Sequence, residues 1–154
     1  MLLGLTILAA TTAALTAINA GVFFAFSTFI VPAARRLKPV EAVHAFQAIN
    51  RQVPRSLYLP VFLLSGAGGL ATAILALLAT ASSFVLAGGA VAFLALLVSF
   101  AINIPRNTVL DGASDREAAA AWKRYVDGWA LGNHVRTLLC VIAVGLLVAG
   151  LVGL

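Results

Sequence analysis

Four long apolar stretches dominate the pattern of hydrophobic and polar positions along the chain. They cover residues 2–31, 57–80, 84–104 and roughly 134–154. Each is close to or above the ~20 residues with which an α-helix crosses the hydrocarbon core of a bilayer. The pattern predicts an all-α fold, with residues 1–154 forming a single membrane domain built as a four-transmembrane-helix bundle.

The polar connections between these stretches predict two further helical features. Between Val40 and Val53 one helical face carries Ala42, Phe46, Ile49 and Val53, and the opposite face carries His44, Gln47 and Arg51. We therefore expect an amphipathic helix along the membrane surface after the first span. Nothing between Glu117 and Leu154 demands a break, so we expect the fourth span to continue out of the membrane as a helical extension.

Composition supports the membrane assignment, and charge gives it a direction. The chain is 62% hydrophobic and 10% charged, with a mean hydropathy of +1.08, which a soluble domain of this size could not place on its surface. Basic residues fill the first and third connections, whereas the second, residues 80–83, is uncharged. The positive-inside rule predicts that both charged connections are cytoplasmic and both termini outside, in a bacterial-type inner membrane.

The net charge of +5 has a different meaning here than in a soluble protein. In a membrane protein it reports topology and contact with anionic lipid, so we expect the lipid bilayer and no nucleic acid as a partner.

Glycines at 66, 68, 69, 88, 89, 128 and 132 allow helices to approach closely. They serve packing within the bundle or, alternatively, a homo-oligomer interface.

The two halves of the chain resemble each other in sequence. Ser27–Pro32 ends the first span as Ser99–Pro105 ends the third, and Glu41–Phe46 is echoed by Glu117–Trp122. Spans one and three run in the same direction, so this pattern predicts a parallel two-fold internal repeat.

One helical face near the start of the fourth span carries the strongest local signal. It holds Trp122, Tyr125, Trp129, Asn133 and Arg136. An unpaired charge inside the membrane costs several kcal/mol, so Arg136 requires a partner, a ligand or water. His134 lies about 100° away from this stripe and points elsewhere.

Polar residues on other spans predict a pocket facing this stripe. Ser99, Asn103 and Arg106 share one face around Pro105, which frees backbone groups near Ala101. Thr12, Thr16 and Asn19 share a face of the first span with Phe23 and Phe26. Such a polar pocket at the cytoplasmic side, with aromatic walls, suits a flat phenolic or quinone-like ligand. The alternatives are hydroxyls bonded to their own backbone, amides that join helices and an interfacial belt of Trp and Tyr.

Several standard chemistries have no signature in this chain. Metal-spaced Cys and His sets, glycine-rich phosphate loops and nucleophile elbows are absent, and two histidines are too few for a haem or copper centre within one chain. The spans carry no acidic residue, which argues against ion-coupled transport. We predict no metal site and no cofactor, and leave metal content open. Cys140 is interpreted as a packing residue.

These motifs together resemble the anthrone oxygenase-like membrane family, also known as DUF1772. The resemblance covers almost the whole chain and rests on four motifs: Phe26-Ser27 to Pro32, Ile49-Asn50, Asn103-x-Pro-x-Asn107, and Trp122-x-x-Tyr125-x-x-x-Trp129-x-x-x-Asn133-His134-x-Arg136. Gly132 stands where the family often has an aromatic residue, which predicts an enlarged or reshaped pocket. The resemblance implies oxidation of the activated methylene of an anthrone, or of another lipophilic phenolic substrate, to a quinone with O2.

The resemblance also implies roles for individual residues. His134 is the candidate base, Arg136 offsets anionic charge, and Asn103, Asn107 and Asn133 orient oxygens. Substrate binding falls to Trp122, Tyr125, Trp129, Asn50, Asn19 and Phe23. Two other functions fit the same residues: a non-catalytic binder or carrier of a small lipophilic aromatic ligand, and a membrane scaffold or assembly protein.

Overall fold

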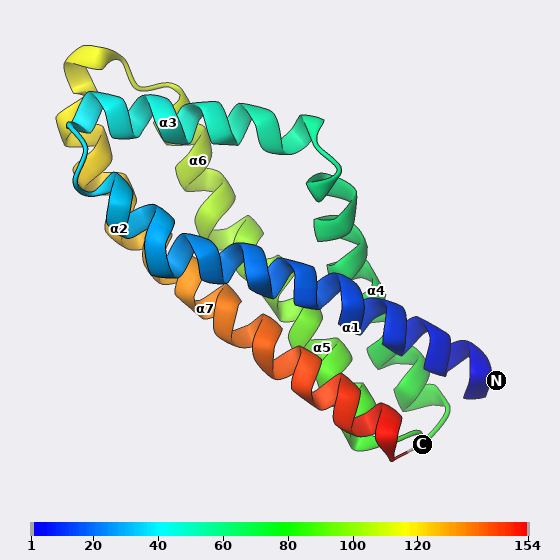
Figure 1. Ribbon diagram of the computed structural model, residues 1–154. Helices are drawn as coiled ribbons and strands as arrows, with labels where there is room; N and C mark the ends of the chain where they lie inside the picture. Colours follow the sequence, from blue (N-terminus) through cyan, green and yellow to red (C-terminus); the bar gives the residue numbers. More distant parts are fainter. Residues whose placement is uncertain (1, 154) are drawn as a thin grey trace.

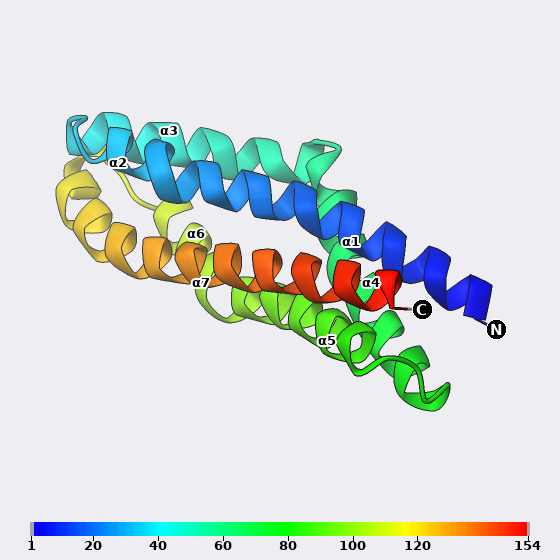
Figure 2. The ribbon, with the colours of Figure 1, turned by 60° about the horizontal axis from the view of Figure 1, so that its bottom comes forward.

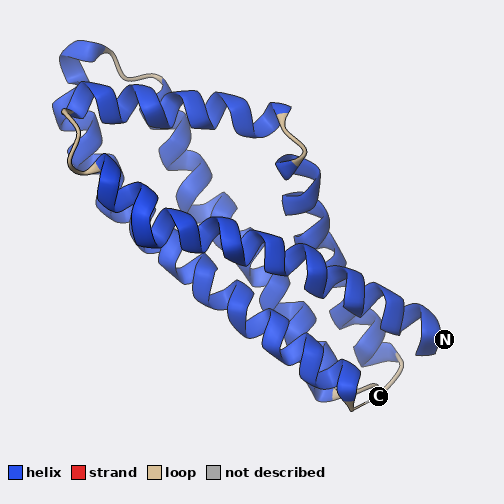
Figure 3. Ribbon diagram, in the orientation of Figure 1, coloured by secondary structure: helices blue, strands red, loops and turns tan. Residues whose placement is uncertain are grey.

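The computed structural model describes residues 2–153, and every regular element in that part of the chain is a helix (Figure 3). Met1 and Leu154, the ends of the predicted domain, lie outside the described residues. The α-helices are α1 (Leu2–Ala25), α2 (Val31–Ala34), α3 (Pro39–Gln52), α4 (Tyr58–Leu78), α5 (Ser83–Val98), α6 (Ile104–Asp111) and α7 (Ala118–Val152). Short π-helical turns at Phe26–Ile30 and Ser99–Asn103 join α1 to α2 and α5 to α6, and short 3-10 turns lie at Val53–Arg55 and Asp115–Glu117.

Four helical segments are long and apolar enough to cross a membrane. They are Leu3–Ala34, Tyr58–Leu78, Ser83–Asp111 and Asp115–Val152. The predicted all-α four-span fold is therefore confirmed, and the chain is an integral membrane protein.

The four spans pack in a ring in which each long helix has two main neighbours. Helix α1 packs against α4 and α7, and α5 packs against the same two helices. Figures 1 and 2 place both termini and the α4–α5 turn at one end of the bundle and α3 across the other. We call the latter the charged end, defined as residues 35–55 and 106–127, because it holds every charged residue except Arg136.

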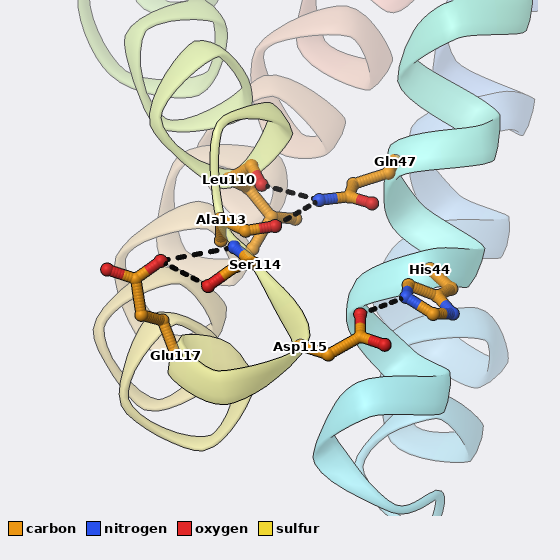
Figure 4. A network of polar contacts seen from close by, with 7 residues as sticks. All are labelled: His44, Gln47, Leu110, Ala113, Ser114, Asp115 and Glu117. Carbon is orange, nitrogen blue, oxygen red and sulfur yellow. Dashed lines mark hydrogen bonds and ion pairs between the residues drawn. The ribbon is translucent and has the colours of Figure 1, made fainter.

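Helix α3 forms as the amphipathic pattern predicts, but Gln47 is buried and not exposed as expected. Ala42 and Phe46 are buried against α7, as the pattern requires. Gln47, expected on the polar face, is also buried, and its Nε2 donates to the carbonyls of Leu110 and Ala113 at 3.0 and 3.1 Å (Figure 4). These carbonyls lie at and just beyond the C-terminal end of α6, where no further helical turn supplies N–H donors. A side chain that can donate hydrogen bonds therefore fits there, and an apolar side chain does not.

The fourth span is one continuous helix with an extension, as predicted. Its 35 residues in α7 make a rod of about 52 Å, longer than the about 30 Å hydrocarbon core. Glu117 caps the preceding turn, because its Oε2 accepts from the backbone N–H and the hydroxyl of Ser114 at 3.1 and 2.7 Å (Figure 4).

Both proline exits are preceded by a π-helical turn. Pro32 and Pro105 each lie two residues after the last residue of these turns, Phe26–Ile30 and Ser99–Asn103. A proline ring obstructs the carbonyl four residues earlier, and a widened turn accommodates it. At the second exit the Arg106 side chain donates to the carbonyl of Ile102 at 3.0 Å. The two turns occupy matching places in the two halves, and the internal repeat itself stays a prediction.

Glycines hold α4 and α5 in close contact. A Cβ atom added to Gly69 would lie 2.8 Å from the carbonyl oxygen of Gly89, and one added to Gly89 would lie 2.7 Å from that of Gly69. Only residues without a side chain fit at this distance. Packing within the bundle therefore accounts for this pair.

We predict that Gly89→Ala lowers the midpoint of thermal unfolding in detergent, with a cost of about 1–3 kcal/mol from overpacking. Gly145→Ala is the matched control, because a Cβ atom there meets nothing within 4 Å. Equal midpoints for the two variants would contradict this account of the α4–α5 contact.

Candidate functional site

A cavity of about 530 Å³ lies where the spans meet the charged end. Its apolar walls include Phe23, Phe26, Phe62 and Trp129. Its polar lining comes from α3, α4, the Ser99–Asn103 turn, α6 and α7, namely Asn50, Tyr58, Ser99, Asn103, Asn107, Thr108, Asp111, Asn133 and Arg136. Ligand pockets have volumes of about 300–1,000 Å³ and this kind of lining.

Arg136 is the only cationic residue in this lining, and it is 6% exposed. Its Nη2 donates to Asn133 Oδ1 at 2.8 Å and its Nη1 to Ser99 Oγ at 3.3 Å. The guanidinium carbon lies 4.1 Å from the centre of the Phe23 ring. No carboxylate of the described residues pairs with Arg136, and its Nε has no hydrogen-bond partner there. The positive charge is oriented by neutral groups and left uncompensated.

Asn133 positions this guanidinium and is itself fully engaged. Its Nδ2 donates to the carbonyl of Phe23 at 2.7 Å and to Ser27 Oγ at 2.8 Å, while its Oδ1 accepts from Arg136. Ser27 also lies 2.8 Å from Nδ1 of His134. A chain of hydrogen bonds thus runs from His134 through Ser27 and Asn133 to Arg136.

Asn103 joins two helices at the cavity wall. Its Nδ2 donates to the carbonyl of Trp129 at 3.0 Å, and a Cβ atom on Gly132 would lie 2.7 Å from its Oδ1. Gly132 faces Asn103 and Ile102 and does not line the cavity. The missing aromatic at 132 therefore permits close helix packing and does not enlarge the pocket as we expected.

Asn107 has its amide orientation fixed by two aromatic donors. Its Oδ1 accepts from the Tyr125 hydroxyl at 3.0 Å and from the Trp129 indole at 2.8 Å. Its Nδ2 makes no hydrogen bond within residues 2–153, so the cavity lining keeps one free amide donor.

The cavity also contains two titratable residues that the sequence patterns did not indicate. Asp111 is the only acidic residue in the lining, and its Oδ1 accepts from Asn50 Nδ2 at 3.1 Å. Tyr58 lines the cavity with its hydroxyl unpaired. The signal for Asp111 was its spacing, because it lies one helical turn after Asn107.

Four predicted site residues do not line this cavity. His134 is exposed on the outer side of α7, in agreement with its predicted angle from the stripe. Asn19 lies beside a much smaller void near Phe62 and Ser65. Trp122 and Tyr125 stack on each other, with ring centres 5.8 Å apart, in the core at the charged end. Tyr125 is linked to the cavity only through its hydrogen bond to Asn107, and the predicted roles of all four residues stay predictions.

The hydroxyls of the first span are used for helix packing. Thr12 lies 3.3 Å from the Thr72 hydroxyl and Thr16 lies 3.0 Å from that of Ser65, both across the contact between α1 and α4.

Among the described residues no three of His, Cys, Asp and Glu gather in a group that could hold a metal ion.

Comparison with known families agrees with this architecture. The family model described as anthrone oxygenase matches residues 44–146, more than half of the chain. The chain belongs to the anthrone oxygenase family. The matched segment supplies Asn50, Asp111, Asn133 and Arg136 to the cavity of this anthrone oxygenase family member, whereas the Phe23 wall lies before it. No curated protein and no solved structure matches the chain.

We predict that Asn133→Ala destabilises the protein by about 1–3 kcal/mol, since it removes the buried amide donor to the Phe23 carbonyl and the acceptor for Nη2 of Arg136. His134→Ala removes one exposed contact and should cost less than about 1 kcal/mol. Thermal unfolding in detergent, followed by tryptophan fluorescence, measures both. A larger loss of stability for His134→Ala than for Asn133→Ala would contradict the conclusion that Asn133 contributes more to this hydrogen-bond network.

Proposed function

We propose that this protein is a membrane oxygenase that oxidises an anthrone-like or other lipophilic phenolic substrate with O2 inside the cavity. The observation that carries the proposal is the uncompensated guanidinium of Arg136 in the wall of an otherwise largely apolar cavity. A site of this kind favours a flat, neutral aromatic that becomes an anion during the reaction. Membership of the anthrone oxygenase family supports the same choice.

The reaction needs a base and a stabilised anion. Removal of a proton from the activated methylene gives an electron-rich carbanion whose charge is shared with the ketone oxygen. The carbanion carbon bonds to O2, which is reduced to a hydroperoxide, and loss of water across the C–H and O–O bonds then gives the quinone. Each anthrone and O2 thus yield one quinone and one water, with O2 as the only oxidant.

In this proposal Arg136 stabilises the anionic oxygen, and the free Nδ2 of Asn107 donates to a second oxygen. Phe23, Phe26 and Trp129 flank the rings. The alignment of Arg136 depends on Asn133 and Ser99.

Asp111 is the proton acceptor we favour. It is the one carboxylate in the lining, and Asn50 orients it through Oδ1. Its Oδ2 accepts no hydrogen bond within residues 2–153, so it is available for a substrate proton. His134, the base implied by the family resemblance, is exposed outside the cavity, and we assign it the support of Ser27 and Asn133 instead.

The first test measures O2 uptake and quinone absorbance when the purified protein in detergent is given a hydroxylated anthrone. Arg136→Gln should lower kcat/KM by about 100-fold or more, because a preorganised charge at a developing oxyanion is lost. Arg116→Gln, in the exposed turn before α7, is the matched control and should keep the activity.

Two outcomes would overturn the oxidase assignment. A wild-type protein that is thermally stabilised by the anthrone without O2 uptake would be a binder or carrier. A wild-type protein that shows neither effect would leave only an assembly role.

The second test concerns the base. Asp111→Asn should lower kcat by about 10²-fold, and Asp111→Glu should recover part of it. The defect should shrink as the pH approaches the pKa of the anthrone itself, because the substrate then ionises without help. An unchanged rate for Asp111→Asn at neutral pH would exclude this carboxylate.

A further inference from the structure

A second hollow, of about 260 Å³, lies between α6 and α7 and shares no lining residue with the cavity. We call it the α6–α7 groove, lined by Pro105, Arg106, Val109, Leu110, Ala121, Arg124 and Tyr125. Its lining includes two arginines and no acidic residue. The remainder is apolar apart from the hydroxyl of Tyr125, which is bonded to Asn107.

Neither guanidinium pairs with a carboxylate within residues 2–153. Arg106 is half-buried and its Nη1 donates to the Ile102 carbonyl, while Arg124 is exposed and makes no hydrogen bond or ion pair among the described residues. Gly128 leaves space for the Arg106 side chain, because a Cβ atom at residue 128 would lie 2.5 Å from Nε of Arg106. The pKa of Glu117 is lowered chiefly by its hydrogen bonds from Ser114 and to a smaller extent by the charge of Arg124, with which it forms no ion pair.

Every acidic residue of the chain is already engaged elsewhere. Asp127 pairs with Arg35, Asp115 with His44, and Asp111 accepts from Asn50. Glu117 accepts from Ser114, and Glu41 accepts from the backbone N–H of Lys38. The chain has five Asp and Glu in total, so an anion for Arg106 and Arg124 has to come from outside.

The groove lies where the apolar length of the third span ends. No charged residue occurs between Arg55 and Arg106, so Arg106 is the first charge after the apolar length of α4 and α5. Val109, which lines the groove, is 73% exposed, and Leu110 and Ala121 form a buried apolar floor. Basic residues above an apolar floor at this boundary match a phosphate attached to acyl chains.

We propose that the α6–α7 groove binds one anionic phospholipid of the surrounding bilayer. Arg106 and Arg124 donate to its phosphate, and Val109, Leu110 and Ala121 contact the first part of its acyl chain. Arginine suits this task because its planar group donates two parallel hydrogen bonds to phosphate oxygens.

The test is native mass spectrometry of the protein in detergent, titrated with phosphatidylglycerol or with phosphatidylcholine of the same acyl chains. The wild type should retain one phosphatidylglycerol in preference to phosphatidylcholine. Arg124→Gln should weaken this retention by about fivefold, the effect of one basic residue near an anionic headgroup. The double variant Arg106→Gln/Arg124→Gln should lose the preference.

Lys123→Gln is the matched control, because Lys123 is the adjacent exposed cation on α7 and does not line the groove. It should bind as the wild type does. Equal losses in Lys123→Gln and Arg124→Gln would mean diffuse surface charge and would overturn the site, as would equal retention of both lipids by the wild type. Complete displacement by inorganic phosphate would show an anion site that does not use the acyl chain, and would overturn the lipid as occupant.

Discussion

A buried guanidinium inside an apolar helical bundle is the constraint on which the structure of this protein depends. Arg136 could not remain 6% exposed within a membrane span without groups to satisfy it. These groups come from three spans: Asn133 on α7 itself, Ser99 at the end of α5, and the ring of Phe23 on α1. The contacts that these neutral groups make with the guanidinium therefore also fix the mutual positions of α1, α5 and α7.

The two proline exits serve this constraint directly. Each is preceded by a π-helical turn, and each turn holds one serine of the network around Arg136. Ser27 accepts from Asn133, and Ser99 accepts from Arg136 itself. A π turn shifts the register of the residues after it, so it changes which side chains face the bundle interior. Each of the two proline exits thus supplies one hydroxyl to the same site.

Much of the candidate site was predictable because it follows helical periodicity. The stripe of Trp129, Asn133 and Arg136 lies on one face of an unbroken helix, so spacing alone indicated that these residues point together. The same arithmetic indicated that His134 points away, and it is exposed. Tyr58 could not be recognised in this way, because its place in the cavity depends on what lies opposite it on other helices. For Asp111 the spacing from Asn107 indicated a shared face, but not that this face lines the cavity. Gln47 was assigned to the wrong side, since only the end of α6 gives a buried amide its partners.

By itself the sequence determined the membrane class, the four spans, the amphipathic α3 and the long α7, since these depend on the hydrophobicity and period of contiguous segments. The family motifs were likewise readable from it. Only the tertiary structure decided which polar faces share a cavity, that Gly132 serves packing, and that Asp111 rather than His134 lines the cavity that Arg136 lines. The physical reason is that helix packing sets the direction of each face toward its neighbours, and packing depends on contacts between residues far apart in the chain.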